Sequence, residues 1–194
     1  ASGFRTPDTA YALGRTLGQI YSRELGRLQR IPEPEIRRVA QKVLEKQLKL
    51  PALLYLRMGL GASLDPPAYQ EGQLALVDGR LEEAMAKATE TLRAAPWFYG
   101  ALGLEAQAHL MKARDAQSSE EARKELENAK TAVRKAQAMA PSDPEMVDLG
   151  TRILIQSMGL WPLPPEALLR TVQDMEDGCQ AWILLDGTNP TPLI

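Results

Sequence analysis

The chain is poor in the residues that build most metal and catalytic centres. Its 194 residues include a single cysteine, Cys179, and a single histidine, His109. One cysteine excludes an internal disulfide and any site with several thiolate ligands, and one histidine excludes paired-histidine metal sites. No nucleophile, base and orienting group can be assembled from these two residues, so we expect a chain that is not an enzyme and has no cofactor or metal.

Residues that favour β-strands are also scarce. The sequence contains 7 Ile and 6 Val, and aromatic residues make up 5% of it, whereas Leu and Ala number 29 and 26. Strands favour β-branched and aromatic residues, while Ala and Leu rank highest in helix propensity. The composition therefore predicts an all-α fold.

Long apolar runs are missing as well. No segment approaches the roughly eighteen uninterrupted apolar residues that a membrane-spanning helix needs, so we expect no membrane contact from this chain. The sequence begins with Ala and lacks a basic segment followed by an apolar one, which is the pattern of a secretory leader. We expect a piece of a longer protein, with the cytoplasm favoured and the periplasm possible if a leader or membrane span precedes Ala1.

The net charge of −2 conceals an uneven distribution. Residues 1–60 carry a net charge of +6, and residues 61–194 carry −8. A candidate basic face for phosphate or an acidic partner consists of Arg23, Arg27, Arg30, Arg37 and Arg38. No aromatic residues alternate with these arginines, which argues against nucleic acid, and the alternative is a solvated helix face neutralised by the acidic half.

Apolar residues recur at steps of three and four along most of the chain, which predicts helices. One of the resulting stripes contains Ile36, Val39, Ala40, Val43, Leu44 and Leu48. Pro and Gly separate the segments, and Thr6-Pro7, Ser118 with Glu121, and Ser142 with Glu145 are typical helix starts. About nine helices are predicted, near residues 8–30, 34–49, 51–61, 67–77, 80–94, 97–114, 118–139, 143–158 and 166–186.

The predicted helices form pairs that repeat. The second helix of each pair ends at Pro51, Pro96, Pro141 or Gly187, which are 45, 45 and 46 residues apart. A constant period of this size is typical of an α-solenoid, in which each helix pair buries its apolar face against the next pair. We expect an α-α superhelix of antiparallel helix pairs.

Residues 65–98 resemble the tetratricopeptide repeat. Gly72, Gly79, Ala84 and Pro96 follow one another at steps of 7, 5 and 12, as the small residues and the closing proline do in that family. The resemblance implies three repeats at 65–98, 99–143 and 144–187, a tail at 188–194, and a helical hairpin with a short helix at 1–64. The second and third units exceed the usual repeat length of about 34 residues, because the helices or the turn between them are longer.

Long repeats of this kind resemble the tetratricopeptide segments beside bacterial serine/threonine protein kinase domains. The resemblance is carried mainly by the run from Tyr11–Gly14 through Ala95–Trp97, although the chain contains no kinase motif. It implies a non-catalytic protein-interaction and regulatory module that binds a protein or peptide, or an attached kinase domain. The alternative is a structural adaptor or oligomerisation scaffold that pairs as a homodimer through the first hairpin or the last helix.

Tetratricopeptide modules bind ligands in a concave groove lined by the first helix of each pair. The resemblance assigns the partner-binding groove to Tyr69, Gln70, Gln73, Leu76, Gln107, Leu110, Met111, Thr151 and Leu154. The Lys, Arg and Asn of the family's carboxylate clamp are missing at these positions, so we expect an apolar or helical ligand. The alternative is that the C-terminal tail or a neighbouring domain closes the groove. His109 is interpreted as a packing residue.

Overall fold

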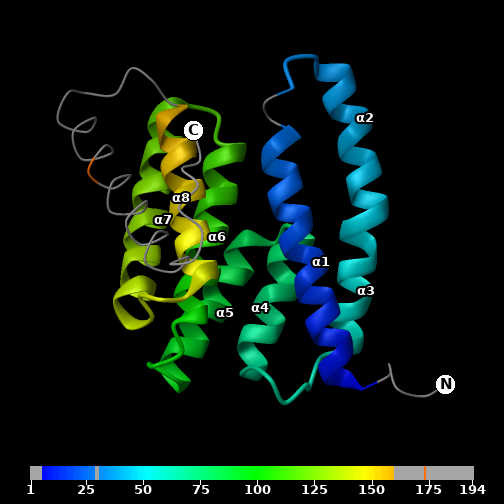
Figure 1. The fold of residues 1–194 in the computed structure, drawn as a ribbon, viewed down its shortest axis with the longest axis vertical. Helices are drawn as coiled ribbons and strands as arrows, with labels where there is room; N and C mark the ends of the chain where they lie inside the picture. Colours follow the sequence, from blue (N-terminus) through cyan, green and yellow to red (C-terminus); the bar gives the residue numbers. More distant parts are fainter. Residues whose placement is uncertain (1–5, 29–30, 160–172, 174–194) are drawn as a thin grey trace, which may run out of the picture. The chain divides into compact units, whose positions relative to one another are not determined.

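The computed structural model of the chain describes residues 6–28, 31–159 and 173. This part of the chain is helical and contains no strand, which confirms the all-α prediction. Figure 1 shows the helices in chain order. They are α1 (Pro7–Leu28), α2 (Pro34–Leu44), the π-helical turn η1 (Glu45–Lys49), α3 (Leu50–Met58), α4 (Pro67–Asp78), α5 (Leu81–Ala94), α6 (Gly100–Asp115), α7 (Ser119–Met139) and α8 (Pro144–Met158).

Local sequence signals determine several helix ends. Gly79 ends α4 with a positive φ of 93°, which glycine adopts without steric cost, and its N–H donates to the carbonyl oxygens of Ala75 and Leu76. The Ser118 hydroxyl accepts a hydrogen bond of 3.1 Å from the backbone N–H of Glu121, as predicted for the start of α7. These ends follow from residues within one turn of the chain, so the sequence is sufficient to place them.

The predicted cap of α8 is wrong by one residue. The Asp143 carboxylate, rather than the Ser142 hydroxyl, accepts hydrogen bonds from the N–H groups of Glu145 and Met146, at 2.8 and 3.0 Å. Pro144 occupies the first helical position, where its fixed φ suits the helix and its missing N–H costs nothing. The residue before this proline is therefore the cap.

The predicted break at Pro51 is also wrong, because α2, η1 and α3 form one continuous rod that runs antiparallel to α1 (Figure 1). Both junction residues, Glu45 and Leu50, have helical backbone angles. A proline inside an α-helix removes one hydrogen bond and clashes with the preceding turn. In η1 the Leu50 N–H donates to Glu45, five residues back, and this wider turn accommodates Pro51. The described residues thus form seven helical rods; the helix predicted near 166–186 lies outside them.

The chain divides into two units, residues 1–91 and 92–194, with the division inside α5. The predicted boundary after residue 64 falls within the first unit. In this unit α3 packs against α1 and α4, and the core consists of Tyr11, Ala52, Leu53, Leu56, Ala62 and Val77.

Two glycines allow the backbones of α1 and α3 to approach closely. A Cβ on Gly14 would lie 2.6 Å from the backbone nitrogen of Leu56, and one on Gly59 would lie 2.5 Å from that of Tyr11. The obstructing atoms are backbone, so no side-chain movement relieves these contacts. The α1–α3 interface therefore requires glycine at both positions.

The second unit is built around α6, which packs on α7 and α8. The largest core cluster of its described residues consists of Ala106, Leu110, Ala113, Leu126, Ala129, Ala132, Val133, Leu149 and Ile153. The alanines at 106 and 129 are fully buried, as expected for positions where helices approach closely. A smaller cluster adds Leu102, Ala136 and Met146.

Candidate interaction surface

The four predicted groove residues of the first unit lie on α4 and are buried: Tyr69, Gln70, Gln73 and Leu76. The Gln70 amide connects α4 to the preceding loop, accepting from the Gly61 N–H at 2.9 Å and donating to the carbonyls of Ala62 and Asp65 at 2.7 Å. Gln73 donates to the Tyr69 hydroxyl at 2.7 Å. The side-chain amides of both glutamines therefore form hydrogen bonds within the protein.

The remaining predicted groove residues belong to the second unit. Gln107 and Leu110 on α6 are buried, and Leu110 is part of the main core cluster. Met111, Thr151 and Leu154 are half-buried, and the Thr151 hydroxyl donates to the Val147 carbonyl at 3.0 Å. The groove assignment stays a prediction.

His109 is partnered, as expected for a packing residue. Its Nδ1 lies 2.6 Å from a carboxylate oxygen of Glu125 on α7, and the Lys112 ammonium lies 3.3 Å from the other oxygen. Burial raises the pKa of Glu125, but the hydrogen bonds from His109 and Lys112 outweigh it and leave the pKa below its ordinary value. The three side chains connect α6 to α7.

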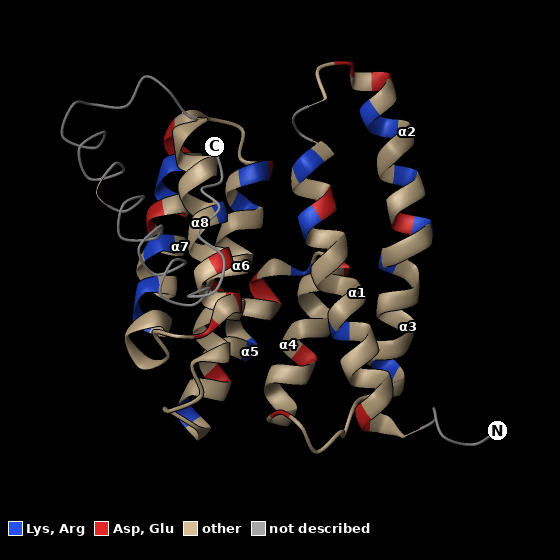
Figure 2. Cartoon of the chain, viewed as in Figure 1, with Lys and Arg blue, Asp and Glu red and all other residues tan. Residues whose placement is uncertain are grey.

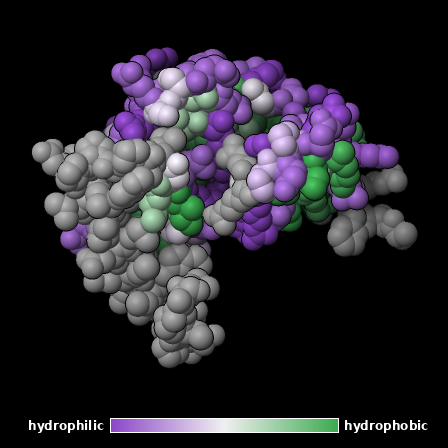
Figure 3. Space-filling model, turned by 90° about the horizontal axis from the view of Figure 1, so that it is seen from above, coloured by the Kyte–Doolittle hydropathy of each residue, from purple (hydrophilic) through white to green (hydrophobic). Residues whose placement is uncertain are grey.

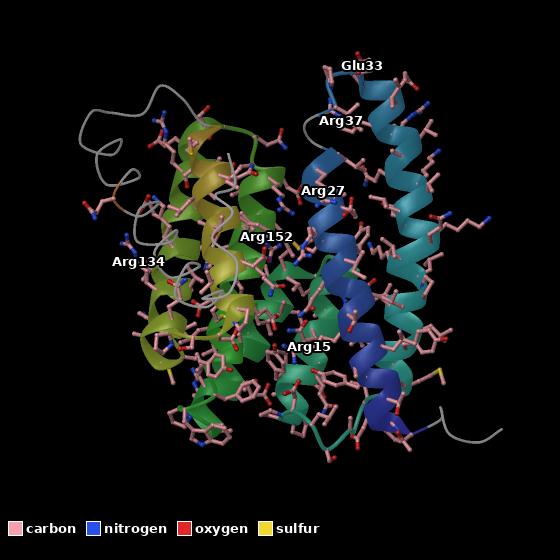
Figure 4. All side chains as sticks on the ribbon, viewed as in Figure 1. Arg15, Arg27, Glu33, Arg37, Arg134 and Arg152 are labelled. Carbon is pink, nitrogen blue, oxygen red and sulfur yellow. The ribbon has the colours of Figure 1, made fainter. Side chains whose placement is uncertain are left out.

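A second polar cluster lies in the first unit, where Arg15 reaches from α1 toward α4 (Figure 4). The Arg15 guanidinium lies 3.4 Å from the Asp65 carboxylate and 5.9 Å from the centre of the Tyr69 ring. Burial raises the pKa of the neighbouring Tyr11 far above its ordinary value, and Tyr69 and Asp65 add to this effect. The Tyr11 phenol therefore remains neutral, which suits a core residue.

Neither cluster resembles a metal centre. Over residues 6–28, 31–159 and 173, no three His, Cys, Asp or Glu side chains lie together as metal ligands would. Within the same ranges, no helix has the length and apolarity needed to cross a bilayer. Cys179 lies outside the described residues.

The predicted basic face is divided between two helices. Arg23 and Arg27 lie on α1, and Arg37 and Arg38 lie on α2. Arg27 and Arg37 lie near the end of the hairpin where α1 leads into α2 (Figure 4). Arg27 and Arg38 form ion pairs with Glu24 and Glu35 on their own helices, at 2.6 and 2.7 Å. Arg30 lies outside the described residues.

The surface that sequence reasoning missed is an apolar row on the rod of α2, η1 and α3. None of the α2 side chains is buried. The row, called the outer row below, has exposed fractions of 45–60% and consists of Ile36, Val39, Val43, Leu50, Leu54 and Met58. Seen from above, hydrophobic surface is visible among hydrophilic groups on the side of α2 (Figure 3).

The predicted stripe at residues 36–48, on α2 and η1, therefore divides between an exposed and a half-buried environment. Its members Ala40, Leu44 and Leu48 are half-buried, whereas Ile36, Val39 and Val43 are exposed. The stripe is wider than the surface that α1 covers, so packing against α1 satisfies one edge of it only. The signal was present in the sequence as the breadth of this stripe, but periodicity alone does not say which edge is covered.

Comparison of the chain with protein-family models, with curated proteins and with solved structures found no match.

Proposed function

We propose that this protein is a non-catalytic protein-interaction module that docks another protein on the outer row. The observation that carries the proposal is the row itself, which consists of six apolar side chains at least 45% exposed along one rod. Single exposed apolar residues are ordinary, whereas contiguous apolar patches typically mark interaction sites.

The rod presents this row on a supported scaffold. On the opposite side of α3, Ala52, Leu53 and Leu56 are buried in the core of the first unit. The row is therefore attached to a packed element, and a partner would not have to order it first. Such preorganisation lowers the entropic cost of binding.

As part of the same proposal, we infer that the chain is a tetratricopeptide-like solenoid attached to a bacterial signalling kinase. Gly79 at the turn between α4 and α5, together with the full burial of Ala84, supports one repeat of this kind. The partner would be an attached domain or a separate protein. The homodimeric scaffold expected as the alternative would use the first hairpin, which includes α2, or the helix predicted near 166–186.

Site-specific photo-crosslinking in the cells that produce the protein tests the docking surface. A benzophenone side chain replaces Val39 or Leu54 in the full chain, and Ala138, an exposed residue on α7, serves as the control position. We expect a discrete covalent protein adduct from positions 39 and 54 and none from position 138. Absence of an adduct at both positions on the rod would contradict the proposal.

A further inference from the structure

The charges beside the outer row restrict what it binds. On the basis of the proposed function, we infer that the row receives an amphipathic helix of another protein, with an aliphatic face and acidic flanking residues. Residues 33–58 contain six Lys or Arg and three Glu, and Lys and Arg occur along most of the rod (Figure 2).

The basic side chains form a row of their own. Arg38, Lys42 and Lys46 follow at steps of four, which places them on one side of the helix, and Arg57 returns to this side three turns later. Together these four residues are called the basic row. Lys42 lies one turn beyond Val39, so the basic row borders the outer row.

Most of the basic row lacks a counter-charge in the described part of the chain. Arg38 pairs with Glu35 at 2.7 Å, whereas Lys42, Lys46 and Arg57 form no ion pair with any described residue. All four side chains are exposed. Acidic groups on a partner would therefore meet available cations without displacing internal pairs.

The chemistry of the outer row favours a helix over a lipid surface. Its members are Met58 and five aliphatic residues, of which Ile36, Val39 and Val43 are β-branched. Ile36, Val39 and Val43 follow at steps of three and four in α2, and Leu50, Leu54 and Met58 follow at steps of four in α3. Such spacings form the holes that receive side chains of a facing helix. Helices that lie in the membrane interface often combine Leu with Trp or Phe on their apolar face, and the outer row contains Leu but no aromatic residue.

Charge argues against a second copy of the chain as the occupant. An antiparallel two-fold pair would have to centre near Lys46 to bring Val43 opposite Leu50 and Val39 opposite Leu54. That arrangement places Lys46 beside Lys46 of the second copy. An acidic helix has no such conflict, because it brings carboxylates to the same place.

Two synthetic peptides of about four heptads test the inference. Both have Ile and Leu at the core positions; one has Glu and the other Lys at the flanking positions, so like charges keep each peptide from self-pairing. Titration calorimetry with the full chain should give at least tenfold tighter binding of the Glu peptide, with an affinity that falls as salt is raised. The bound Glu peptide should gain helical circular dichroism.

Two double variants test whether the peptides bind beside the basic row of the rod. K42E/K46E should reverse the preference, so that the Lys peptide binds more tightly. K124E/K135E, which reverses two exposed lysines on α7, should leave the preference unchanged. If K124E/K135E reverses the preference and K42E/K46E does not, the assignment to the rod is wrong.

Any other occupant of the outer row would give a different experimental outcome. Equal binding of the two peptides, or binding of neither, would overturn the acidic-helix inference. A dimer in light scattering that V39S/V43S abolishes would identify a second copy, and binding to phosphatidylserine vesicles that V39S/V43S abolishes would identify a bilayer; either would overturn it. Photo-adducts from positions 39 and 54 would in these cases preserve the docking surface, whereas their absence would remove the proposed function itself.

Discussion

Glu125 illustrates how a buried carboxylate is stabilised between two helices. Removal from water disfavours its ionised form, but His109 at 2.6 Å and Lys112 at 3.3 Å donate to its two oxygens. Because the second effect is larger, the pKa of Glu125 lies below its ordinary value. The ionised carboxylate therefore stabilises the folded state relative to the unfolded one.

This coupling predicts a pH dependence of stability. A depressed pKa contributes stability that is fully present above the unfolded value, about 4.3, and is lost as the pH falls toward the folded value. The amount by which the free energy of unfolding of wild type exceeds that of Glu125→Gln should thus shrink as the pH falls below about 5. Urea unfolding followed by circular dichroism from pH 3 to 7 measures both. A difference that grows as the pH falls from about 5 to 3 would contradict the assignment.

The rod of α2, η1 and α3 presents two faces of opposite character. Leu56 is 1% exposed and packs in the core of the first unit, while Leu54, two residues earlier, is 57% exposed. The same substitution at these two positions therefore probes burial with helix propensity held constant.

Leu56→Ala should lower the free energy of unfolding by about 2–5 kcal/mol, because it leaves a cavity between helices. Leu54→Ala should change it by less than about 0.5 kcal/mol, as is usual for surface positions. Urea midpoints of the two variants test this, and comparable losses would show that the outer row is covered in the free protein. Leu54→Ala should still weaken docking if the outer row is the interface.

Helix positions were predictable because Pro, Gly, Ser and Asp act within one turn of the chain, as at Gly79 and Ser118. The environment of each face was not, because burial depends on contacts between distant segments. Gln70 illustrates the difficulty: a polar residue at a predicted ligand-binding position is fully buried because the loop at residues 61–65 needs its amide. The break predicted at Pro51 is absent for a related reason, since the π-helical turn that tolerates this proline has no recognised sequence signal.

Among the residues that the structure describes, each unit has a core cluster of its own. One includes Leu56 with Tyr11 and Val77, and the other includes Leu126 with Leu110 and Ile153. The composition that first indicated helices, rich in Ala and Leu, supplies much of both clusters. Cooperative unfolding of each unit about its own core is the expected behaviour.

Matched substitutions in the two cores test this expectation. Leu56→Ala should lower the urea midpoint for amides of α1 and α3 and leave those of α6 and α7 nearly unchanged, and Leu126→Ala should do the reverse. Hydrogen exchange with mass spectrometry at increasing urea resolves the two regions. Equal shifts of both regions in either variant would show that the chain unfolds as one unit.

The π-helical turn has a genetic consequence. It holds five residues where an α-helical turn holds about four, so the deletion of Gln47 would leave the orientation of both ends of the rod nearly intact. The deletion would also bring Pro51 into a regular helix, where it causes a kink. Pro51→Ala would remove this penalty, so the two changes compensate for each other. Related sequences are therefore expected to gain or lose the extra residue and the proline together, as an epistatic pair.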